Sequence, residues 1–349
     1  MSKLRRNGVA SQEVPQHLTT VDSLRGFAAM SVCLFHLTGE GMPKFTEPTL
    51  RALFQWGWAG VDVFFVISGF IIPLTMLRSG YRLGAYGNFL GRRLFRVGPP
   101  SWVLVGLTVA TFFAIDNFRG DESYWSKGLG WWRIFHNLAY TVEFTDYLWI
   151  NPVFWTLAVE FQFYVLIGLV MPFAFHSLSR FLVVALPTLL LHYAPLPDGI
   201  VFFDHVALFL IGGAALLYFE AKVSLGSYLA LVGGLSVAAA LQVGPTQAVF
   251  GCGTALVISF ARTNSPVGAF LGRISYSLYL VHGLVGALTA SVLGQLLPPL
   301  SFLPKLIIIL AAVAASLAAA WLFHLMVERP SMRLAHRTFR SSVRREPAL

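Results

Sequence analysis

The chain has 349 residues, of which 56% are hydrophobic and only 12% are charged. An ordinary soluble domain carries roughly 25% charged residues, so this composition excludes a soluble globular protein and indicates a polytopic membrane protein. The formal net charge of +9 does not indicate a nucleic-acid partner, because the basic residues flank apolar segments instead of forming one stripe.

The N-terminal segment, residues 1–20, is polar and lacks the apolar stretch that a cleavable signal needs. We therefore expect the first membrane span to direct the chain to the membrane. A bundle of spans buries its apolar surface in the bilayer and stays one unit, so we expect residues 1–349 to form a single domain.

Apolar runs of about 20 residues predict an all-α membrane bundle of about ten transmembrane helices. The predicted spans are 21–38, 57–77, 97–115, 153–174, 180–194, 200–219, 226–242, 246–261, 274–295 and 303–326. An even number of spans leaves both termini on one side, and that side receives most of the 25 Lys and Arg residues. The positive-inside rule makes it cytoplasmic, and the basic tail 335–349 is expected there, on anionic headgroups.

The first predicted span contains three ionisable residues, Asp22, Arg25 and His36, which are costly at membrane depth unless they serve a site. Arg25 and His36 are eleven residues apart. This spacing predicts that they share one helix face, separated by about 16 Å along the axis, as suits one elongated substrate. Asp22, three residues before Arg25, can pair with the guanidinium and orient it.

The chemistry of these side chains favours acyl transfer. His36 suits a general base that takes a proton from an acceptor hydroxyl, because the imidazole pKa lies near neutrality. Arg25 suits the binding of phosphate or of developing negative charge. The structural alternative is a snorkelling arginine and a histidine that bonds a neighbouring helix.

The longest predicted loop, 116–152, lies on the opposite side from the termini and is rich in tryptophan. It carries Trp125, Trp131, Trp132 and Trp149. Such residues are typical of the aromatic belt at a membrane interface. Stacking on sugar rings is the alternative interpretation, and both are open at this point.

Six segments in order resemble the acyltransferase 3 family, membrane enzymes that O-acylate polysaccharides, lipopolysaccharide and nodulation factors. They are the Arg25-x10-His36 arrangement, Gly60–Phe70, Arg92–Pro99, Phe154–Tyr164, Arg273–His282 and Val327–Pro330. Together they span about residues 20 to 334. The resemblance implies an acyl-CoA donor, most often acetyl-CoA, and a hydroxyl acceptor on a glycan, glycolipid or lipid-linked sugar. It also implies a multi-pass protein of the bacterial inner membrane, in contact with membrane lipids.

The matching segments supply the candidate site residues. We expect His36, Arg25 and Glu160 to be catalytic, with Glu160 orienting His36 or binding an acceptor hydroxyl. Arg92, Arg93 and Arg96 are expected to bind the phosphates of coenzyme A through charge-assisted hydrogen bonds, although such arginines also fit plain positive-inside topology. The expected substrate-binding residues are Asp62, Ser68, Tyr164, Tyr276, Tyr279 and His282.

Two features limit the alternatives. His192, His205 and His324 lack the spacing of a metal site, so no metal is expected. The rival function is a secondary transporter that uses Arg25, His36 and Glu160 as an ion or anion site, although paired broken helices in two matching halves are not evident. A non-catalytic partner in polysaccharide assembly is a third possibility. The function that we expect is O-acyl transfer from acyl-CoA to a glycan hydroxyl.

Overall fold

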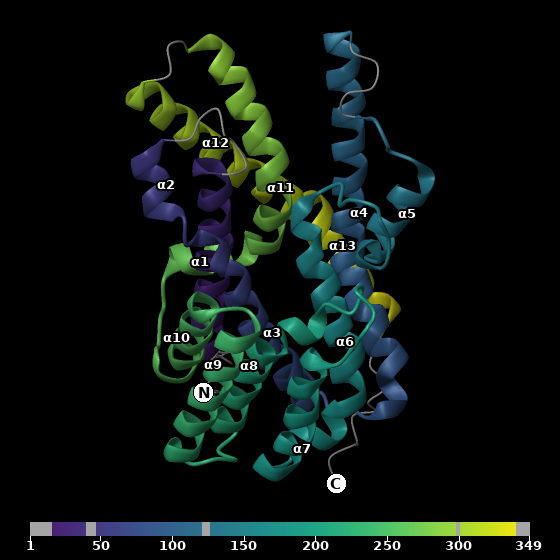
Figure 1. The fold of residues 1–349 in the computed structure, drawn as a ribbon, viewed down its shortest axis with the longest axis vertical. Helices are drawn as coiled ribbons and strands as arrows, with labels where there is room; N and C mark the ends of the chain where they lie inside the picture. The colour runs from purple at the N-terminus through teal and green to yellow at the C-terminus, as the bar shows by residue number, and fades with distance from the viewer. Residues whose placement is uncertain (1–15, 40–46, 121–125, 298–300, 340–349) are drawn as a thin grey trace, which may run out of the picture.

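The structure, a computed structural model, describes residues 16–39, 47–120, 126–297 and 301–339. Within these ranges the chain is helical and has no β-strand (Figure 1), which confirms the predicted all-α fold. Trp125, residues 1–15 of the polar N-terminus and residues 340–349 of the basic tail lie outside the described residues. The single-domain assignment and the side on which the termini lie stay predictions.

The described residues form a series of α-helices along the chain. They are α1 Gln16–Thr38, α2 Pro48–Phe54, α3 Gly60–Arg78, α4 Tyr86–Arg119, α5 Trp131–Ala139, α6 Trp155–Ala174, α7 Leu178–Leu190, α8 Val206–Phe219, α9 Leu225–Gln242, α10 Pro245–Phe260, α11 Pro266–Leu296, α12 Phe302–Phe323 and α13 Arg329–Thr338. A π-helical turn, His324–Glu328, joins α12 to α13.

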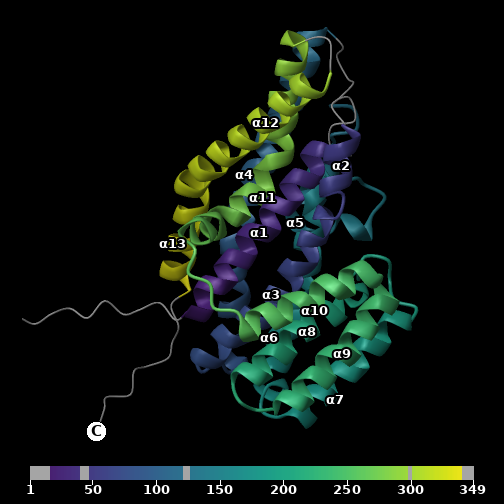
Figure 2. The same ribbon diagram turned by 90° about the vertical axis from the view of Figure 1, so that its left-hand side faces the viewer.

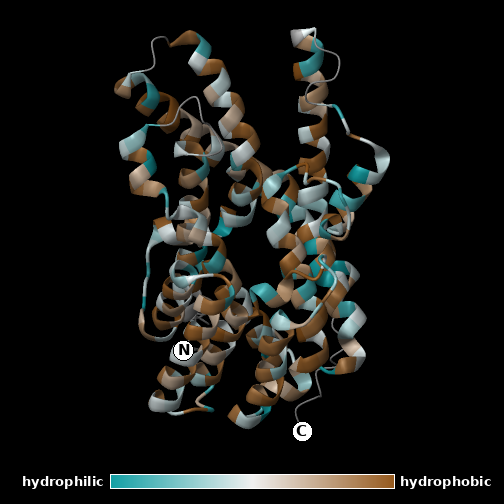
Figure 3. Ribbon diagram, in the orientation of Figure 1, coloured by the Kyte–Doolittle hydropathy of each residue, from teal (hydrophilic) through white to brown (hydrophobic). Residues whose placement is uncertain are grey.

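Each predicted span falls on a helix, but the count of ten spans is only partly supported. Among the described residues, six helical stretches are long and apolar enough to cross a membrane, those that contain α3, α4, α6, α9, α11 and α12. The apolar helices α7, α8 and α10 are shorter. Helix α1 is not among the six, because Asp22, Arg25 and His36 lower its mean hydropathy. In Figure 3, hydrophobic residues predominate along the long helices, as expected for an integral membrane protein.

Helix α4 differs most from its predicted span. It has 34 residues, which correspond to a length of about 51 Å, whereas the hydrocarbon core of a bilayer is about 30 Å thick. The helix therefore projects beyond that core. Arg92, Arg93 and Arg96 lie in its first half, on the same continuous helix as the predicted span and not in a loop before it.

Close helix crossings position α1 against α11. Figure 2 shows α1, α11 and α12 running side by side. A Cβ on Gly272 would lie only 2.2 Å from the backbone oxygen of Asp22, and a Cβ on Gly26 would lie 2.6 Å from the Cβ of Leu271. Small residues allow such approach between membrane helices. The crossing therefore brings Arg25, next to Gly26, alongside the α11 residues that follow Gly272.

A second glycine crossing joins α3 to α8. A Cβ on Gly69 would lie 2.0 Å from the oxygen of Phe209, and one on Gly212 would lie 2.0 Å from that of Val66. Helices α7 to α10 gather at one end of the molecule, on the side of α3 away from α12 (Figures 1 and 2). This group supports α3, which carries Ser68 into the centre of the bundle.

Candidate active site

A central cavity of about 370 Å³ lies where α1, α3, α4, α6 and α11 meet. This volume is within the range of small-ligand pockets. Its polar lining comes from all five helices and consists of Asp22, Arg25, Ser68, Arg93, Arg96, Thr156, Glu160, Tyr164, Tyr276 and Tyr279. Most of the residues predicted to form a site therefore share one cavity, although they are up to 257 positions apart in the sequence, from Asp22 to Tyr279.

Helical spacing explains which side chains reach the cavity. Asp22 and Arg25 are three residues apart on α1, and Tyr276 and Tyr279 are three apart on α11, so each pair lies on one helix face. Ser68 lines the cavity and Asp62 does not, in keeping with their 600° separation around α3. Asp62 is buried at 4% exposure, and its Oδ2 has no hydrogen-bond partner among the described residues. Asp62 is thus not brought to the site.

Hydrogen bonds fix the polar walls. The Ser68 hydroxyl donates to Glu160 Oε1 at 2.9 Å, which links α3 to α6. The Tyr279 hydroxyl donates to the Val153 oxygen at 3.1 Å and lies 2.8 Å from the Thr156 hydroxyl. These contacts hold Glu160 and Tyr279 at defined places in the wall, so the cavity presents a carboxylate and phenols to any molecule that enters it.

Electrostatic interactions join the charged groups of this wall. Glu160 lines the same cavity as Arg25 and Arg93. Arg93 also stacks over the rings of Phe89 and Tyr164, with its guanidinium carbon 5.5 and 5.6 Å from their centroids. The lining holds three arginines, Arg25, Arg93 and Arg96, against two acidic residues, Asp22 and Glu160, so arginines are in excess. The predicted ion pair between Asp22 and Arg25 is not among the ion pairs of the described residues.

His36 lies beside the central cavity and is not part of its lining. It is half-buried near the end of α1, and His282 Nε2 is 3.0 Å from its Nδ1. His282, expected to bind substrate, is buried at 1% exposure and does not line the cavity either. Tyr279, one helical turn before His282, does line it, and the two rings are 6.2 Å apart. The histidine pair is therefore next to the cavity wall formed by Tyr279.

A second cavity, here called the arginine pocket, adjoins the central cavity. It has a volume of about 260 Å³. Arg93 and Arg96 line both cavities, and Arg92 lines the arginine pocket alone. The other lining residues are Thr75, Met76, Ser79, Tyr81, Phe89, Met332, Ala335 and His336. The three arginines predicted to bind the donor thus lie together, at a boundary between two spaces.

The arginine pocket is lined in part by α13, a helix that was not predicted to belong to the site. Met332, Ala335 and His336 come from α13, which packs against α4. Their spacing of three and four is the only signal in the sequence, because it places them on one helix face. His336 adds a further hydrogen-bonding group to the wall that the arginines form.

A third cavity, here called the Trp58 pocket, lies on the far side of His36 from the arginines. It has a volume of about 220 Å³ and is lined by Phe35, Thr38, Gly39, Arg51, Gln55 and Trp58. The rings of Phe35 and His36 meet edge to face, with centroids 5.1 Å apart. The Trp58 pocket is thus next to Phe35, the neighbour of His36 in α1, whereas His282 is the residue that links His36 to Tyr279 in the wall of the central cavity.

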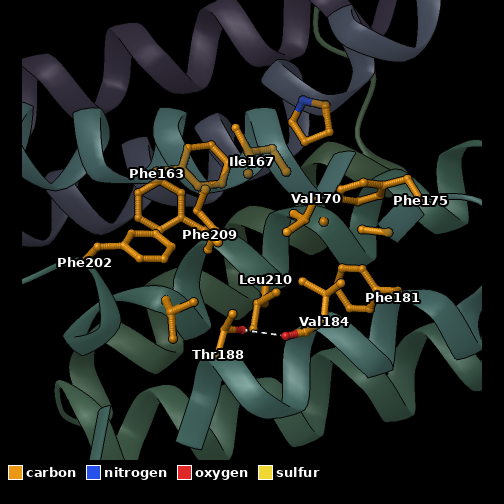
Figure 4. A pocket seen from close by; sticks show the side chains of 16 residues that line it. Phe163, Ile167, Val170, Phe175, Phe181, Val184, Thr188, Phe202, Phe209 and Leu210 are labelled. Carbon is orange, nitrogen blue, oxygen red and sulfur yellow. Dashed lines mark hydrogen bonds between the residues drawn. The ribbon is translucent and has the colours of Figure 1, made fainter. Parts of the chain in front are cut away.

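A further cavity is lined mainly by apolar side chains. It lies between α6, α7 and α8, has a volume of about 40 Å³ and is lined by apolar side chains such as Phe163, Phe181 and Phe209 (Figure 4). The one hydroxyl among the residues drawn, that of Thr188, bonds the backbone oxygen of Val184 at 3.0 Å. So small and apolar a space is a packing defect and not a substrate site.

The described residues contain no group of three metal-ligating side chains.

Glu328, from the closing segment, accepts a hydrogen bond from Ser277 at 2.7 Å and lies 2.9 Å from His324 Nδ1. Two of the matching segments, more than forty residues apart in the sequence, thus meet, because this hydrogen bond joins α11 to the π-helical turn before α13. The partner of His324 in this turn is Glu328.

Taken together, the fold and the site define a class: a helical membrane protein with a polar, cationic cavity beside a histidine pair. The family model described as the acyltransferase domain, Acyl_transf_3, matches residues 18–325. The chain belongs to this family, as its motifs predicted. Membership favours an enzyme over the transporter and over the non-catalytic partner.

Curated relatives resemble part of the chain. It is 32% identical over 171 residues to the putative peptidoglycan O-acetyltransferase YrhL of Bacillus subtilis, covering 43% of this chain and 23% of the relative. It is 31% identical over 175 residues to the O-acetyltransferase OatA of Staphylococcus aureus, covering 46% and 26%. The peptidoglycan O-acetyltransferase OatA of Listeria monocytogenes is 30% identical over 165 residues, covering 43% and 24%. The aligned part is thus about a quarter of each relative. No solved structure matches significantly.

Proposed function

We propose that this protein transfers an acyl group, acetyl in the first instance, from acyl-CoA to a hydroxyl of a cell-envelope glycan or glycolipid. Peptidoglycan is the first acceptor to test, because the similar proteins are named as its O-acetyltransferases. The observation that carries the proposal is that Arg93 and Arg96 line both the arginine pocket and the central cavity. One donor can therefore bind with its phosphates in the pocket and its acyl end in the cavity.

The donor suits this pair of spaces by charge and because the two cavities share Arg93 and Arg96. Arginine suits phosphate because its planar fork of N–H groups forms paired, charge-assisted hydrogen bonds. Three arginines line the arginine pocket, where the phosphates of coenzyme A would bind, on the cytoplasmic side of the bacterial inner membrane. The pantetheine arm would extend past Arg96 into the central cavity, toward Tyr279 and the histidine pair.

The acceptor would reach His36 from the opposite side. The Trp58 pocket combines an indole face with the polar groups of Arg51 and Gln55, a composition that suits a single sugar ring. His36 follows Phe35 of this pocket in α1 and contacts His282, which in turn contacts Tyr279 of the central cavity. The donor and the acceptor would thus approach one imidazole from two sides of the membrane.

The donor, the acceptor and His36 account for every bond and proton that changes in the reaction. His36 takes the proton of the acceptor hydroxyl as its oxygen attacks the thioester carbonyl. A carbon–oxygen bond forms and the carbon–sulfur bond breaks, and the coenzyme A thiolate takes the proton back from His36. The products are the O-acyl glycan and free coenzyme A. Arg25 and Glu160 shape the field in the cavity, with Arg25 stabilising negative charge that develops on the carbonyl oxygen.

The proposal is tested by reconstituting the purified protein in liposomes with radiolabelled acetyl-CoA and peptidoglycan disaccharide fragments. The expected product is labelled glycan whose label is released by mild base, as from an ester. Mass spectrometry of envelope glycans from cells with and without the protein gives the acceptor in vivo. Folded protein that binds acetyl-CoA but labels no glycan or glycolipid would refute the activity.

The donor site yields a first prediction. The Arg96→Ala variant should raise the KM for acetyl-CoA by about 10–100-fold, because each charge-assisted hydrogen bond is worth roughly 1.5–3 kcal/mol. Arg96 is a sharper test than Arg93, which also stacks on two rings. The control is Arg82→Ala, which removes an exposed arginine that lines none of these cavities. Equal KM values for the two variants would contradict the donor site.

The acceptor site yields the converse prediction. The Trp58→Ala variant should raise the KM for the glycan fragment by up to about tenfold, through loss of an aromatic face, and leave the KM for acetyl-CoA unchanged. Steady-state kinetics with each substrate varied in turn measures both constants. The control is Leu53→Ala, an exposed residue of the neighbouring α2 outside the Trp58 pocket. An increase in the donor KM instead would place the acceptor elsewhere.

A further inference from the structure

The contact between His36 and His282 joins α1 to α11 through two imidazole rings. Their nitrogens, His36 Nδ1 and His282 Nε2, are 3.0 Å apart, and the ring centroids are 5.1 Å apart. Either nitrogen could donate the shared proton if the pair stood alone. The contact of each ring with the backbone of its own helix indicates which of them does.

His282 is fixed first, by its own helix. Its Nδ1 lies 3.0 Å from the backbone oxygen of Leu278, one turn earlier on α11. A carbonyl oxygen can only accept a hydrogen bond, so Nδ1 of His282 carries a proton. In a neutral imidazole the other nitrogen then has none. Nε2 of His282, which faces His36, is therefore an acceptor.

His36 is fixed next, by two acceptors. Its Nδ1 lies 3.0 Å from His282 Nε2 and 3.1 Å from the backbone oxygen of Val32. If that nitrogen lacked a proton, its lone pair would face the lone pairs of the carbonyl oxygen. Both contacts are attractive only if Nδ1 of His36 carries the proton. The nitrogen of His36 that can take up a further proton is consequently Nε2.

We propose that His282 is the positioning residue of the active site, which holds His36 in the tautomer whose Nε2 acts as the base. This inference rests on the proposed role of His36 and replaces the expectation that His282 binds substrate. The arrangement resembles in logic the carboxylate–histidine pair of other acyl-transfer enzymes, where a buried acceptor fixes the base. Here the acceptor is a neutral imidazole, buried at 1% exposure between Leu278 and the ring of Tyr279.

The neutral partner suits its surroundings. A carboxylate at this depth would need charged partners, and an unpaired charge within a membrane protein is costly. An imidazole offers an acceptor without bringing a charge. When His36 is protonated during the reaction, its Nδ1–H keeps the same hydrogen bond to His282. The ring therefore stays in place between taking up the proton and returning it.

Two variants of similar size separate positioning from packing. His282→Phe keeps a ring but has no acceptor, and it should lower kcat by about 10²-fold while the KM values for acetyl-CoA and the glycan fragment change less than about threefold. His282→Gln can present its amide oxygen near the place of Nε2, and it should recover at least about tenfold of that loss. Size-exclusion elution and thermal unfolding in detergent check that both variants fold.

The outcomes distinguish this inference from the proposed function. Wild-type kcat in folded His282→Phe, a loss confined to the KM for either substrate, or folded His282→Gln no better than His282→Phe would each overturn the positioning role. His36→Ala is measured alongside. If His36→Ala is inactive and His282→Phe is fully active, only the role of His282 fails; if His36→Ala is active, the base assignment itself fails.

Discussion

The His36→Ala variant should lose about 10²–10⁴-fold in kcat for acetyl transfer, the range that a positioned general base contributes. The reason is that the acceptor hydroxyl no longer has a proton acceptor when it attacks the thioester. The KM for acetyl-CoA should change little, because the arginine pocket lies at the other end of the central cavity and does not include His36. The measurement is the initial rate of label transfer to the glycan fragment, with each substrate varied.

The matched control for this variant is His176→Ala. His176 is exposed, follows α6 and lines none of the cavities described above. It should retain the wild-type rate within about twofold. Transfer by His36→Ala at the wild-type rate would show that another group takes the proton, and it would remove His36 from the mechanism.

The Gly272→Ala variant should give a lower yield of folded protein. Its new Cβ would lie 2.2 Å from the backbone oxygen of Asp22, and a backbone atom cannot move aside as a flexible side chain can. Inserting a methyl group into such a crossing costs about 1–3 kcal/mol or more. We expect a lower yield of monodisperse protein in detergent and a lower thermal unfolding temperature. Arg25 would also shift relative to α11, so the surviving fraction should transfer acyl groups slowly.

Gly283→Ala is the control on the same helix. Gly283 is exposed, and a Cβ there would meet nothing within 4 Å. Since alanine is the better helix former by about 1 kcal/mol, this variant should be as stable as the wild type or more so. Equal unfolding temperatures for Gly272→Ala and Gly283→Ala would mean that α1 and α11 do not cross as described.

The helices could be predicted from the sequence because long apolar runs have few alternatives in a bilayer. All ten predicted segments are helical, and the boundaries differ mainly where polar residues continue a helix. Helix α4 begins at Tyr86, whereas the apolar pattern begins at 97. A hydropathy pattern detects the apolar part of a helix and not its polar continuation, so Arg92 and Arg96 fell outside the predicted span 97–115 although the same helix carries them.

The site could be predicted in part. Of the three residues expected to be catalytic, Arg25 and Glu160 line the central cavity, whereas His36 does not. Tyr276, Tyr279 and His282 are spaced by three along α11 and were all expected to bind substrate. Six residues turn a helix by about 600°, however, so Tyr276 and His282 do not point in the same direction. Tyr276 and Tyr279 reach the cavity, whereas His282 turns toward α1 and meets His36.

The contribution of α13 could not be predicted, because it depends on how distant helices pack. Nothing in the sequence near His336 indicates that α13 lies along α4, and a π-helical turn at His324–Glu328 sets the direction in which α13 leaves α12. The Ser277–Glu328 hydrogen bond holds that turn against α11. The matching motifs contain both residues, but only the packed helices show that they meet.

The central claim is that one donor molecule extends from the arginine pocket into the central cavity. The most direct measurement is an experimental structure of the protein with a thioether analogue of acetyl-CoA, which cannot be cleaved. Phosphate oxygens should lie within hydrogen-bond distance of Arg92 and Arg96, and the sulfur should lie inside the central cavity near Tyr279. An analogue seated elsewhere, or one whose sulfur remains on the arginine-pocket side of Arg93 and Arg96, would contradict it.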